Sequence, residues 1–476
     1  MASLEIRDAI HKRIIVTDRE QTLLDHPYVQ RLRHVRQLGF VPLVYPSATH
    51  DRFSHSIGTA HIAGRLAEEV LFNTSSSVLA RILNPAEKQF LMEILRLAGL
   101  LHDMGHAPFS HSAELAMPPV TALSLPREWL SAKDASRKAT HEDYSVALIA
   151  RLAAERNALL DTEEAAIIAS LIHPKCIKIP PAWERRFSPR INSESVHALA
   201  RSLISSNLDA DRMDYLLRDS YFTGVPYGQF DLDWLISNLG TVELDDKYFL
   251  AIQESGIHAL EHYLFARYHM YSQVYMHKTA KCFEYYFQKA ITEGEIAYTI
   301  PAEPELFAAL RDTTLWEALS RAAARSRHSW SSLLTSRTPA KRIARVWDDR
   351  RAAEKMFQAL RREFAKHRIR SFLHPSYKRF LDLPDSRAQT PRGRQGLILF
   401  GLAALPIAVI RRQLGAVSAA SLDDYSFILK QYRRDLYIAD CYVLREDYET
   451  HRQTIHKLMK KYRNLATGEV LLAEEP

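Results

Sequence analysis

The chain has 476 residues, which is enough for a substantial hydrophobic core and for two or three domains. It is 47% hydrophobic and 25% charged, the composition of an ordinary soluble protein. Its net charge of +7 suits an anionic substrate without requiring one, because the excess is spread over a long chain.

Three further features argue against a secreted or membrane protein. The three cysteines are far apart and odd in number, so neither a disulfide framework nor a paired-cysteine zinc site is indicated. Charged residues interrupt the N-terminal apolar stretch, so no signal peptide is expected. The longest apolar run, Leu397–Ile410, contains Pro406 and is too short to span a bilayer, so we expect a buried helix or two short core segments there. We therefore expect a cytoplasmic protein without membrane contact.

The first half of the chain has mostly helical patterns. Residues 4–16 are expected to be extended. Pro27 and Gly39 predict one helix between them, with proline in the first turn and glycine past the end. On that helix Gln30, Arg33 and Gln37 would form one polar stripe. Further helices are expected over residues 57–72, 86–101, 142–156 and 207–219.

The second half begins with a short β pattern and then becomes helical. Residues 239–253 alternate and break at two aspartates, which predicts a small β-hairpin. A long helix should follow over residues 256–292, with Arg267, Tyr271 and Tyr275 on one face. Beyond residue 300 we expect helices over 305–324, 339–368, 421–434 and 448–462, a loop over 383–396 and a strand over 435–444. The fold class should be mainly α, with a helical C-terminal lobe and a small β element.

The stretch from His102 to His111 concentrates candidate metal ligands directly after an apolar helical run. The adjacent imidazole and carboxylate of His102 and Asp103 suit a first-row divalent ion with water in the open positions. A bare pair of this kind more often only caps and solvates a helix end, so other ligands are needed. His55, at a helix start, and Asp211, in a helix with three aspartates in six residues, are the candidates. Two imidazoles and two carboxylates suit Mn, Fe, Mg or Zn more than a structural zinc site.

Four motifs occur in an order that resembles a known enzyme family. They are Arg52–Ser56, His102–Asp103 with His106 and His111, Thr140–Glu142, and Asp209–Tyr215. The set resembles the HD-domain metal-dependent phosphohydrolases, in particular the deoxynucleoside triphosphate triphosphohydrolases typified by the animal enzyme that carries a sterile alpha motif. The resemblance runs from about Asp8 to His277, and the C-terminal third has no clear motif match. We expect no sterile alpha motif domain before the catalytic unit.

The resemblance implies a metal centre and a general acid. The metal ligands would be His55, His102, Asp103 and Asp211. His111 would protonate the leaving 5′ oxygen, a role that histidine suits at neutral pH. Glu114 stands where the family often has an aspartate that orients this acid, and it keeps the carboxylate on a longer arm. His106 and His141 resemble phosphate contacts, although His141 alone would fit a helix-capping position.

The resemblance also implies a binding site for a nucleoside triphosphate. A cationic clamp on the triphosphate would comprise Arg52, Arg212 and Arg267. Because a triphosphate carries roughly four negative charges near neutral pH, several cations must surround it. Arg212 stands where relatives commonly have lysine, which keeps the charge and adds a planar fork of donors. The sugar contacts, which would exclude a 2′ hydroxyl, are Gln37, Tyr215 and Asp219. Tyr271 and Tyr275 are assigned to the substrate as well, with core packing as the alternative.

Three residues near the N-terminus match an effector site of the regulated animal relative. Asp25 could accept hydrogen bonds from N1 and N2 of guanine, and Gln30 or Arg33 could donate to O6. The alternative is that they are a turn residue and a solvated helix face. Because such sites lie between subunits in the family, activation by GTP or dGTP should accompany assembly into a dimer or tetramer.

We therefore expect an HD phosphohydrolase domain over residues 1–295 and a helical lobe over 296–476 that serves packing, oligomerisation or regulation. The expected reaction is metal-dependent hydrolysis of deoxynucleoside triphosphates to deoxynucleoside and inorganic triphosphate. One alternative is an HD phosphohydrolase for a signalling nucleotide or a monophosphate. The other is a nucleic-acid-binding protein, suggested by the isoelectric point near 9.1.

Overall fold

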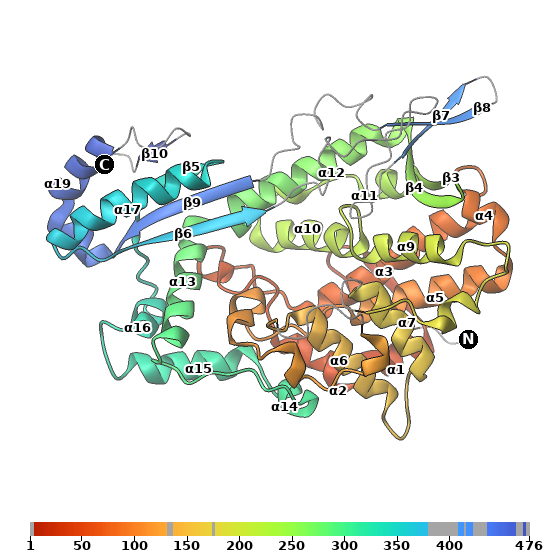
Figure 1. The fold of residues 1–476 in the computed structure, drawn as a ribbon, viewed down its shortest axis with the longest axis horizontal. Helices are drawn as coiled ribbons and strands as arrows, with labels where there is room; N and C mark the ends of the chain where they lie inside the picture. The colour runs from red at the N-terminus through yellow and green to blue at the C-terminus, as the bar shows by residue number, and fades with distance from the viewer. Residues whose placement is uncertain are drawn as a thin grey trace.

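The protein is elongated, with a helical body at one end and a smaller lobe built on a β-sheet at the other (Figure 1). The computed structural model describes residues 4–130, 137–173, 177–378, 408–413, 416–421, 436–462 and 470–472. The predicted loop over 383–396, residues 422–434 of the helix predicted over 421–434, and residues 397–407 of the apolar run lie outside these ranges. The mainly α fold class is confirmed.

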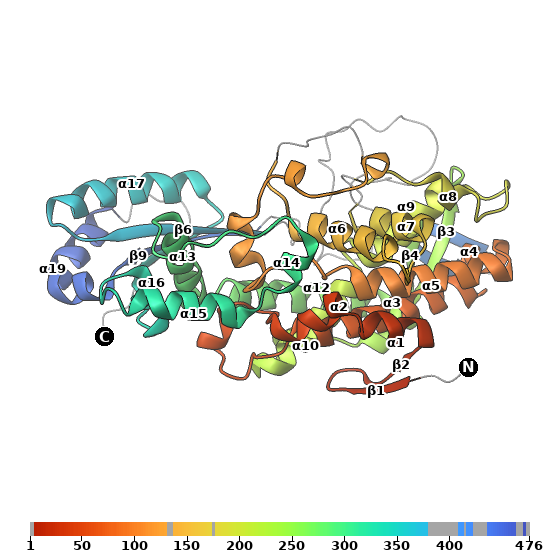
Figure 2. The ribbon, with the colours of Figure 1, turned by 90° about the horizontal axis from the view of Figure 1, so that it is seen from below.

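The N-terminus is extended, as predicted, and forms an antiparallel hairpin of β1 (Leu4–Asp8) and β2 (Lys12–Val16) (Figure 2). Helix α1 (Asp18–Leu24) follows from a capping box, in which the side chain of Thr17 accepts from the backbone of Glu20.

The predicted single helix from Pro27 to Gly39 is wrong. Helix α2 (Pro27–Gln30) passes into one 3₁₀ turn, and Val35 is extended. The carbonyl of Val35 accepts from the backbone N–H of Arg52 at 3.0 Å, so pairing with a distant segment replaces the helix. Gln37 therefore does not share a helical stripe with Gln30 and Arg33.

Six longer helices form the helical body. They are α3 (Arg52–Phe72), α5 (Pro85–Leu101), α6 (His141–Ala153), α7 (Thr162–Ile172), α9 (Ser193–Ile204) and α10 (Ala210–Thr223). Short helices α4 (Val78–Ile82), α8 (Pro181–Glu184) and α11 (Leu232–Ser237) connect them. The predicted helices in this region are confirmed, with α3 beginning five residues earlier than expected.

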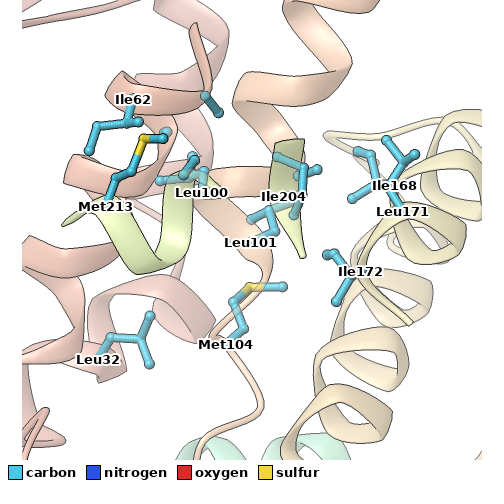
Figure 3. Close-up of a cluster of buried hydrophobic side chains, with 14 of the residues drawn as sticks. Leu32, Ile62, Leu100, Leu101, Met104, Ile168, Leu171, Ile172, Ile204 and Met213 are labelled. Carbon is cyan, nitrogen blue, oxygen red and sulfur yellow. The ribbon is translucent and has the colours of Figure 1, made fainter. Parts of the chain in front are cut away.

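Helix α5 lies at the centre of this body. Its sequence determines where it begins and how closely it can pack against α3. Asn84 caps its start in a capping box with Glu87. Gly99 lets it approach α3 closely, since an added Cβ would lie 3.1 Å from the Cα of Ala60. Figure 3 shows side chains from α3, α5, α7, α9 and α10 meeting around Leu100 and Leu101, which are fully buried. This packing fixes the position of the residues that follow Leu101.

The predicted hairpin over 239–253 is confirmed as β3 (Leu239–Leu244) and β4 (Lys247–Gln253). Both turn residues, Asp245 and Asp246, have positive φ, which suits a two-residue hairpin turn. Strand β7 (Ala408–Gln413) pairs in parallel with β4, and β8 (Ala416–Ser421) completes a sheet of order β3-β4-β7-β8.

The predicted long helix over 256–292 is interrupted. Helix α12 (Ile257–His269) leads into a π-helical turn over Met270–Tyr275, and α13 (Lys278–Thr292) starts anew with His277 as its N-cap. A widened π turn shifts the side chains that follow it and is common at functional sites. Tyr271 and Tyr275 both lie on this turn and contact α10.

The C-terminal lobe contains more β structure than predicted. Helices α14 (Pro304–Ala308), α15 (Asp312–Ala323) and α16 (Trp330–Thr335) lead into it. Its antiparallel sheet has the order β10-β5-β9-β6. The strands are β5 (Lys341–Trp347), β6 (Ser371–Lys378), β9 (Leu436–Val443) and β10 (Val470–Leu472), with helices α17 (Arg350–Lys366) and α19 (Arg445–Tyr462).

Two predictions for this lobe are confirmed and one is wrong. The strand expected over 435–444 is β9, all of whose residues are buried, and the helix expected over 448–462 is α19. The helix expected over 339–368 begins instead as β5. Ile343, Val346 and Trp347 favour a strand, and pairing with β9 buries Ile343 and Val346.

The main hydrophobic cluster begins at Ile14 and includes Phe372, Tyr442 and Leu444 of the C-terminal lobe. A second cluster joins α17 and α19 to the C-terminal sheet, with residues from Ile343 to Met459. The boundary at residue 295 remains a prediction. Cys282 and Cys441 are free and buried. Within the described part of the chain, no helix is long and apolar enough to cross a membrane.

Candidate metal centre and adjoining cavity

The four predicted metal ligands meet between α3, α5 and α10. His55 lies in the first turn of α3, His102 caps the end of α5, and Asp211 lies in the first turn of α10. The Nε2 atom of His55 is 3.0 Å from Oδ1 of Asp211 and 3.6 Å from Oδ2 of Asp103. The Nε2 atom of His102 is 3.2 Å from Asp103 and 3.6 Å from Asp211.

The hydrogen bonds of both histidines leave Nε2 as the ligand atom. The Nδ1 atom of His102 is 2.8 Å from the carbonyl oxygen of Gly99, so Nδ1 must donate. The Nδ1 atom of His55 is 2.7 Å from a carboxylate oxygen of Asp214 and donates in the same way. With a cation bound, each imidazole would be neutral and its Nε2 lone pair would face the ion that the carboxylate oxygens share. His55, His102 and Asp211 therefore fit a divalent ion, and Asp103, 3.2 Å from Nε2 of His102, could add a second carboxylate.

The pKa shifts of His55 and Asp211 also indicate that this cluster favours a bound cation. Burial lowers the pKa of His55, but hydrogen bonds with Asp211 and Asp214 outweigh it and raise that pKa to about 10. Burial raises the pKa of Asp211, but His102 and His55 outweigh it and hold that pKa far below its usual range. The pocket thus strongly favours positive charge.

A second group of side chains lies next to the metal centre. The carboxylate of Glu114 accepts from Nδ1 of His111 at 2.9 Å and from Nδ1 of His141 at 2.7 Å. The rings of His141 and His106 are stacked with centroids 3.9 Å apart, and Nε2 of His106 is 3.3 Å from Asp103. The longer arm of Glu114, compared with aspartate, thus contacts two histidines at once.

A cavity of about 770 Å³ adjoins this group, within the size range of small-molecule sites. Seven of the predicted catalytic and substrate residues line it: Gln37, Arg52, His111, Tyr215, Asp219, Tyr271 and Tyr275. Tyr275 donates to Asp219 at 2.7 Å, and the hydroxyls of Tyr215 and Tyr271 are 3.3 Å apart. The buried Oε1 atom of Gln37 has no hydrogen-bond partner among the described residues. His111 is largely exposed.

The structure does not bring the whole predicted cationic clamp to the cavity wall. Arg52 lines the cavity but donates to Asp103 at 2.5 Å. Arg212 donates to the carboxylate of Asp209, and Arg267 donates to the side chain of Asn207 at 3.2 Å. Neither Arg212 nor Arg267 is among the residues that line the cavity.

The predicted effector residues lie near one another on the surface of the N-terminal segment. Asp25 is the C-cap of α1. The side chain of Gln30 donates to the carbonyl of Leu24 at 2.8 Å and accepts from Nε of Arg33 at 2.9 Å. The guanidinium of Arg33 stacks 3.6 Å from the centroid of Phe53. These contacts are made within the chain.

Sequence reasoning missed the residues that support the metal centre. Asp214 is fully buried and accepts from His55, from His11 at 2.6 Å and from Arg218 at 2.8 Å. Its spacing of three from Asp211 places both carboxylates on one face of α10, and that signal could have identified it. An added Cβ at Gly58 would lie 1.9 Å from Asp214, so this close approach requires glycine.

His50 was also missed. Its Nε2 atom is 2.7 Å from Asp219, and its ring stacks on Phe222 at 4.6 Å between centroids. His50 thereby holds the other oxygen of the carboxylate that Tyr275 contacts.

Comparisons with known proteins agree with this arrangement. Residues 52–219 match the HD domain, and residues 230–370 match the HD associated region. An uncharacterized protein of Methanocaldococcus jannaschii is 34% identical over 60% of this chain and 49% of that protein. The deoxynucleoside triphosphate triphosphohydrolase SAMHD1 homolog of Dictyostelium discoideum is 28% identical over 65% of this chain and 54% of that protein. The chain spans about half the length of the curated relatives it matches.

The C-terminal lobe has a counterpart among solved structures. The structure of a hypothetical protein from Aquifex aeolicus aligns with a TM-score of 0.67 at 24% identity. The alignment covers 95% of this chain and 99% of that chain. The shared fold therefore extends beyond the matched domains.

Proposed function

The chain belongs to the HD-domain phosphohydrolases, and from that premise we propose that it hydrolyses deoxynucleoside triphosphates to deoxynucleoside and inorganic triphosphate. The observation that supports this most is that Arg52, which donates to Asp103 of the candidate metal centre, lines a cavity of about 770 Å³ together with His111 and the sugar-binding candidates. The modest identity to deoxynucleoside triphosphate triphosphohydrolases supports the same substrate class.

The chemistry at the α-phosphorus is assigned as follows. A divalent ion held by His55, His102, Asp103 and Asp211 would polarise the phosphate and activate water for attack. His111 donates a proton to the departing 5′ oxygen. The carboxylate of Glu114 accepts from Nδ1 of His111 at 2.9 Å, which leaves Nε2 as the atom that would donate the proton.

The sugar is assigned to the wall formed by Gln37, Tyr215, Asp219 and Tyr275. Two hydrogen bonds, from His50 and Tyr275 at 2.7 Å each, fix the Asp219 carboxylate. The unpartnered Oε1 atom of Gln37 is suited to accept a hydrogen bond from the 3′ hydroxyl. Tyr215 crowds the position that a 2′ hydroxyl would occupy, so the site should prefer deoxyribose.

The triphosphate is assigned to Arg52, which lines the cavity, and to the pair Arg212 and Arg267, with His106 and His141 near the reacting phosphate. Both arginines would exchange their present contacts with Asp209 and Asn207 for phosphate oxygens. Such an exchange replaces one charged or polar partner by a more highly charged one.

Regulation is the last part of this proposal. A guanine nucleotide, GTP or dGTP, would bind at Asp25, Gln30 and Arg33, and a homo-oligomer would complete that site. Coupling along one continuous helix is not available, because the helix ends before Gln37.

The experiment is incubation with each deoxynucleotide and each of Mn, Fe, Mg and Zn, with the products resolved by ion exchange. Release of inorganic triphosphate is expected. Release of orthophosphate or pyrophosphate would instead favour an HD phosphohydrolase for another nucleotide. Binding of nucleic acid with a steep salt dependence and without turnover would favour the nucleic-acid binder.

A further inference from the structure

A second wall of the cavity comes from outside every motif recognised in the sequence. It is formed by α13 and by β6, the edge strand of the C-terminal sheet, which lie against each other (Figure 1). The residues that line the cavity here are Lys281, Glu284, Tyr285, Gln288 and the β6 segment 373–377. We call this the α13–β6 wall. It shows that the C-terminal lobe takes part in the cavity beside the metal centre.

An ion pair lies in this wall. The Nζ atom of Lys281 donates to Oε2 of Glu284 at 2.7 Å, and the two side chains are 23% and 20% exposed. Withdrawing both charges from water carries a desolvation cost that a single pair does not fully recover. Burial raises the pKa of Glu284, but Lys281 outweighs it, so the carboxylate stays ionised. The wall therefore presents a charged acceptor and a charged donor side by side to the cavity.

The rest of the wall is rigid and partly apolar. The ring of Tyr285 stacks on Phe372 with centroids 3.8 Å apart and planes 2° from parallel. His374 of β6 also lines the cavity, and its buried Nδ1 atom has no hydrogen-bond partner among the described residues. A flat, partly apolar molecule with polar edge groups would fit such a wall.

The position of the wall relative to the sugar contacts suggests what it holds. Tyr271 and Tyr275 directly precede α13, so the α13–β6 wall continues the surface assigned to the sugar. In a nucleotide the base and the phosphates leave the sugar at opposite ends. A substrate with its phosphates at the metal centre would therefore direct its base toward the remaining part of the cavity.

We propose that Glu284 and Lys281 read the Watson–Crick edge of the nucleobase and that guanine satisfies them best. This inference rests on the proposed function. Guanine offers two donors, N1–H and the N2 amino group, to one carboxylate, and its O6 accepts from the adjacent ammonium. Thymine offers one donor, and adenine and cytosine offer one amino group each. The predicted order therefore places dGTP first among the four deoxynucleotides.

The test compares dGTP with dITP, which lacks only the N2 amino group, as substrates of the metal-loaded enzyme, with the same saturating GTP in every assay so that the proposed effector site is filled equally. The wild-type enzyme should have a kcat/KM for dGTP about ten-fold or more above that for dITP, the effect of one hydrogen bond to a charged group. In Glu284→Gln that ratio should fall to about 1, because the amide cannot accept from both donors as the carboxylate does. A general loss of structure would lower both rates together and leave the ratio unchanged.

The matched control is Glu293→Gln, which changes a carboxylate at the end of α13 outside this cavity. In this variant the ratio of kcat/KM for dGTP to that for dITP should stay at its wild-type value. A ratio that remains high in Glu284→Gln, or a wild-type ratio near 1, would overturn base recognition by Glu284 while leaving the proposed hydrolysis intact. Absence of turnover of every deoxynucleotide by the wild-type enzyme would overturn the proposed function and this inference with it.

Discussion

The metal centre, which contacts the cavity-lining Arg52 through Asp103, and the α13–β6 wall lie on the same cavity region but are specified by the chain in different ways. The ligands of the metal centre follow helix ends, as His102 follows α5, or lie in first helical turns, as His55 and Asp211 do. Local sequence therefore places them. The wall depends on a π turn and on the edge of a sheet whose strands lie far apart in sequence. The comparison teaches that the candidate metal centre is encoded in short motifs, whereas the wall proposed to contact the base depends on tertiary structure.

The largest effect should come from removing a ligand of the metal centre. Asp103→Ala removes a carboxylate that faces His55, His102 and Arg52, and it should abolish both bound metal and turnover. Metal content by atomic emission and hydrolysis assays check this. An Asp103→Ala protein that kept stoichiometric metal and full activity would remove this residue from the centre.

The second effect separates the acid from the metal. His111→Ala should lower kcat by on the order of 10²–10⁴-fold, the usual contribution of a general acid, while metal and substrate still bind. Because His111 is largely exposed, the fold should tolerate this change. A variant with unchanged kcat and a raised KM would make His111 a binding residue.

The third effect concerns the support of the metal centre. Asp214→Asn replaces the carboxylate that fixes Nδ1 of His55, so it should weaken metal affinity by about 10–100-fold. Metal titration measures this, and thermal unfolding of the metal-free protein serves as the control for folding. Unchanged affinity in a folded variant would show that His55 is held without Asp214.

The smallest effect concerns the sugar, on the side of the cavity between the two regions. Tyr215→Ala should lower the ratio of kcat/KM for a deoxynucleotide to that for the matching ribonucleotide by about ten-fold or less. This is the size of effect expected when a pocket excludes a single extra hydroxyl group by steric contact. The ratio of kcat/KM for the two substrates measures it. Equal rates with both substrates in the wild-type enzyme would remove Tyr215 from this role.

The sequence could predict that His55, His102, Asp103 and Asp211 lie together, because each belongs to a short pattern beside a strongly periodic helix, and their role as metal ligands stays a prediction. It could not predict the present partner of Arg267, since Asn207 lies 60 residues away, whereas the spacing of three between Asp209 and Arg212 is a pattern that could have indicated their pairing. The sequence pattern predicted a helix where β5 lies, because the pattern does not show the pairing with β9 that makes this segment a strand. It also extended a helix through Gln37, where pairing of Val35 with Arg52 prevailed.

The central claim is attack of water at the α-phosphorus with departure of the 5′ oxygen. The most direct measurement is hydrolysis of a deoxynucleoside triphosphate in ¹⁸O-labelled water, followed by mass spectrometry of both products. The account predicts one labelled oxygen in inorganic triphosphate and none in the deoxynucleoside. Label in orthophosphate or pyrophosphate, or in the 5′ hydroxyl of the deoxynucleoside, would contradict it.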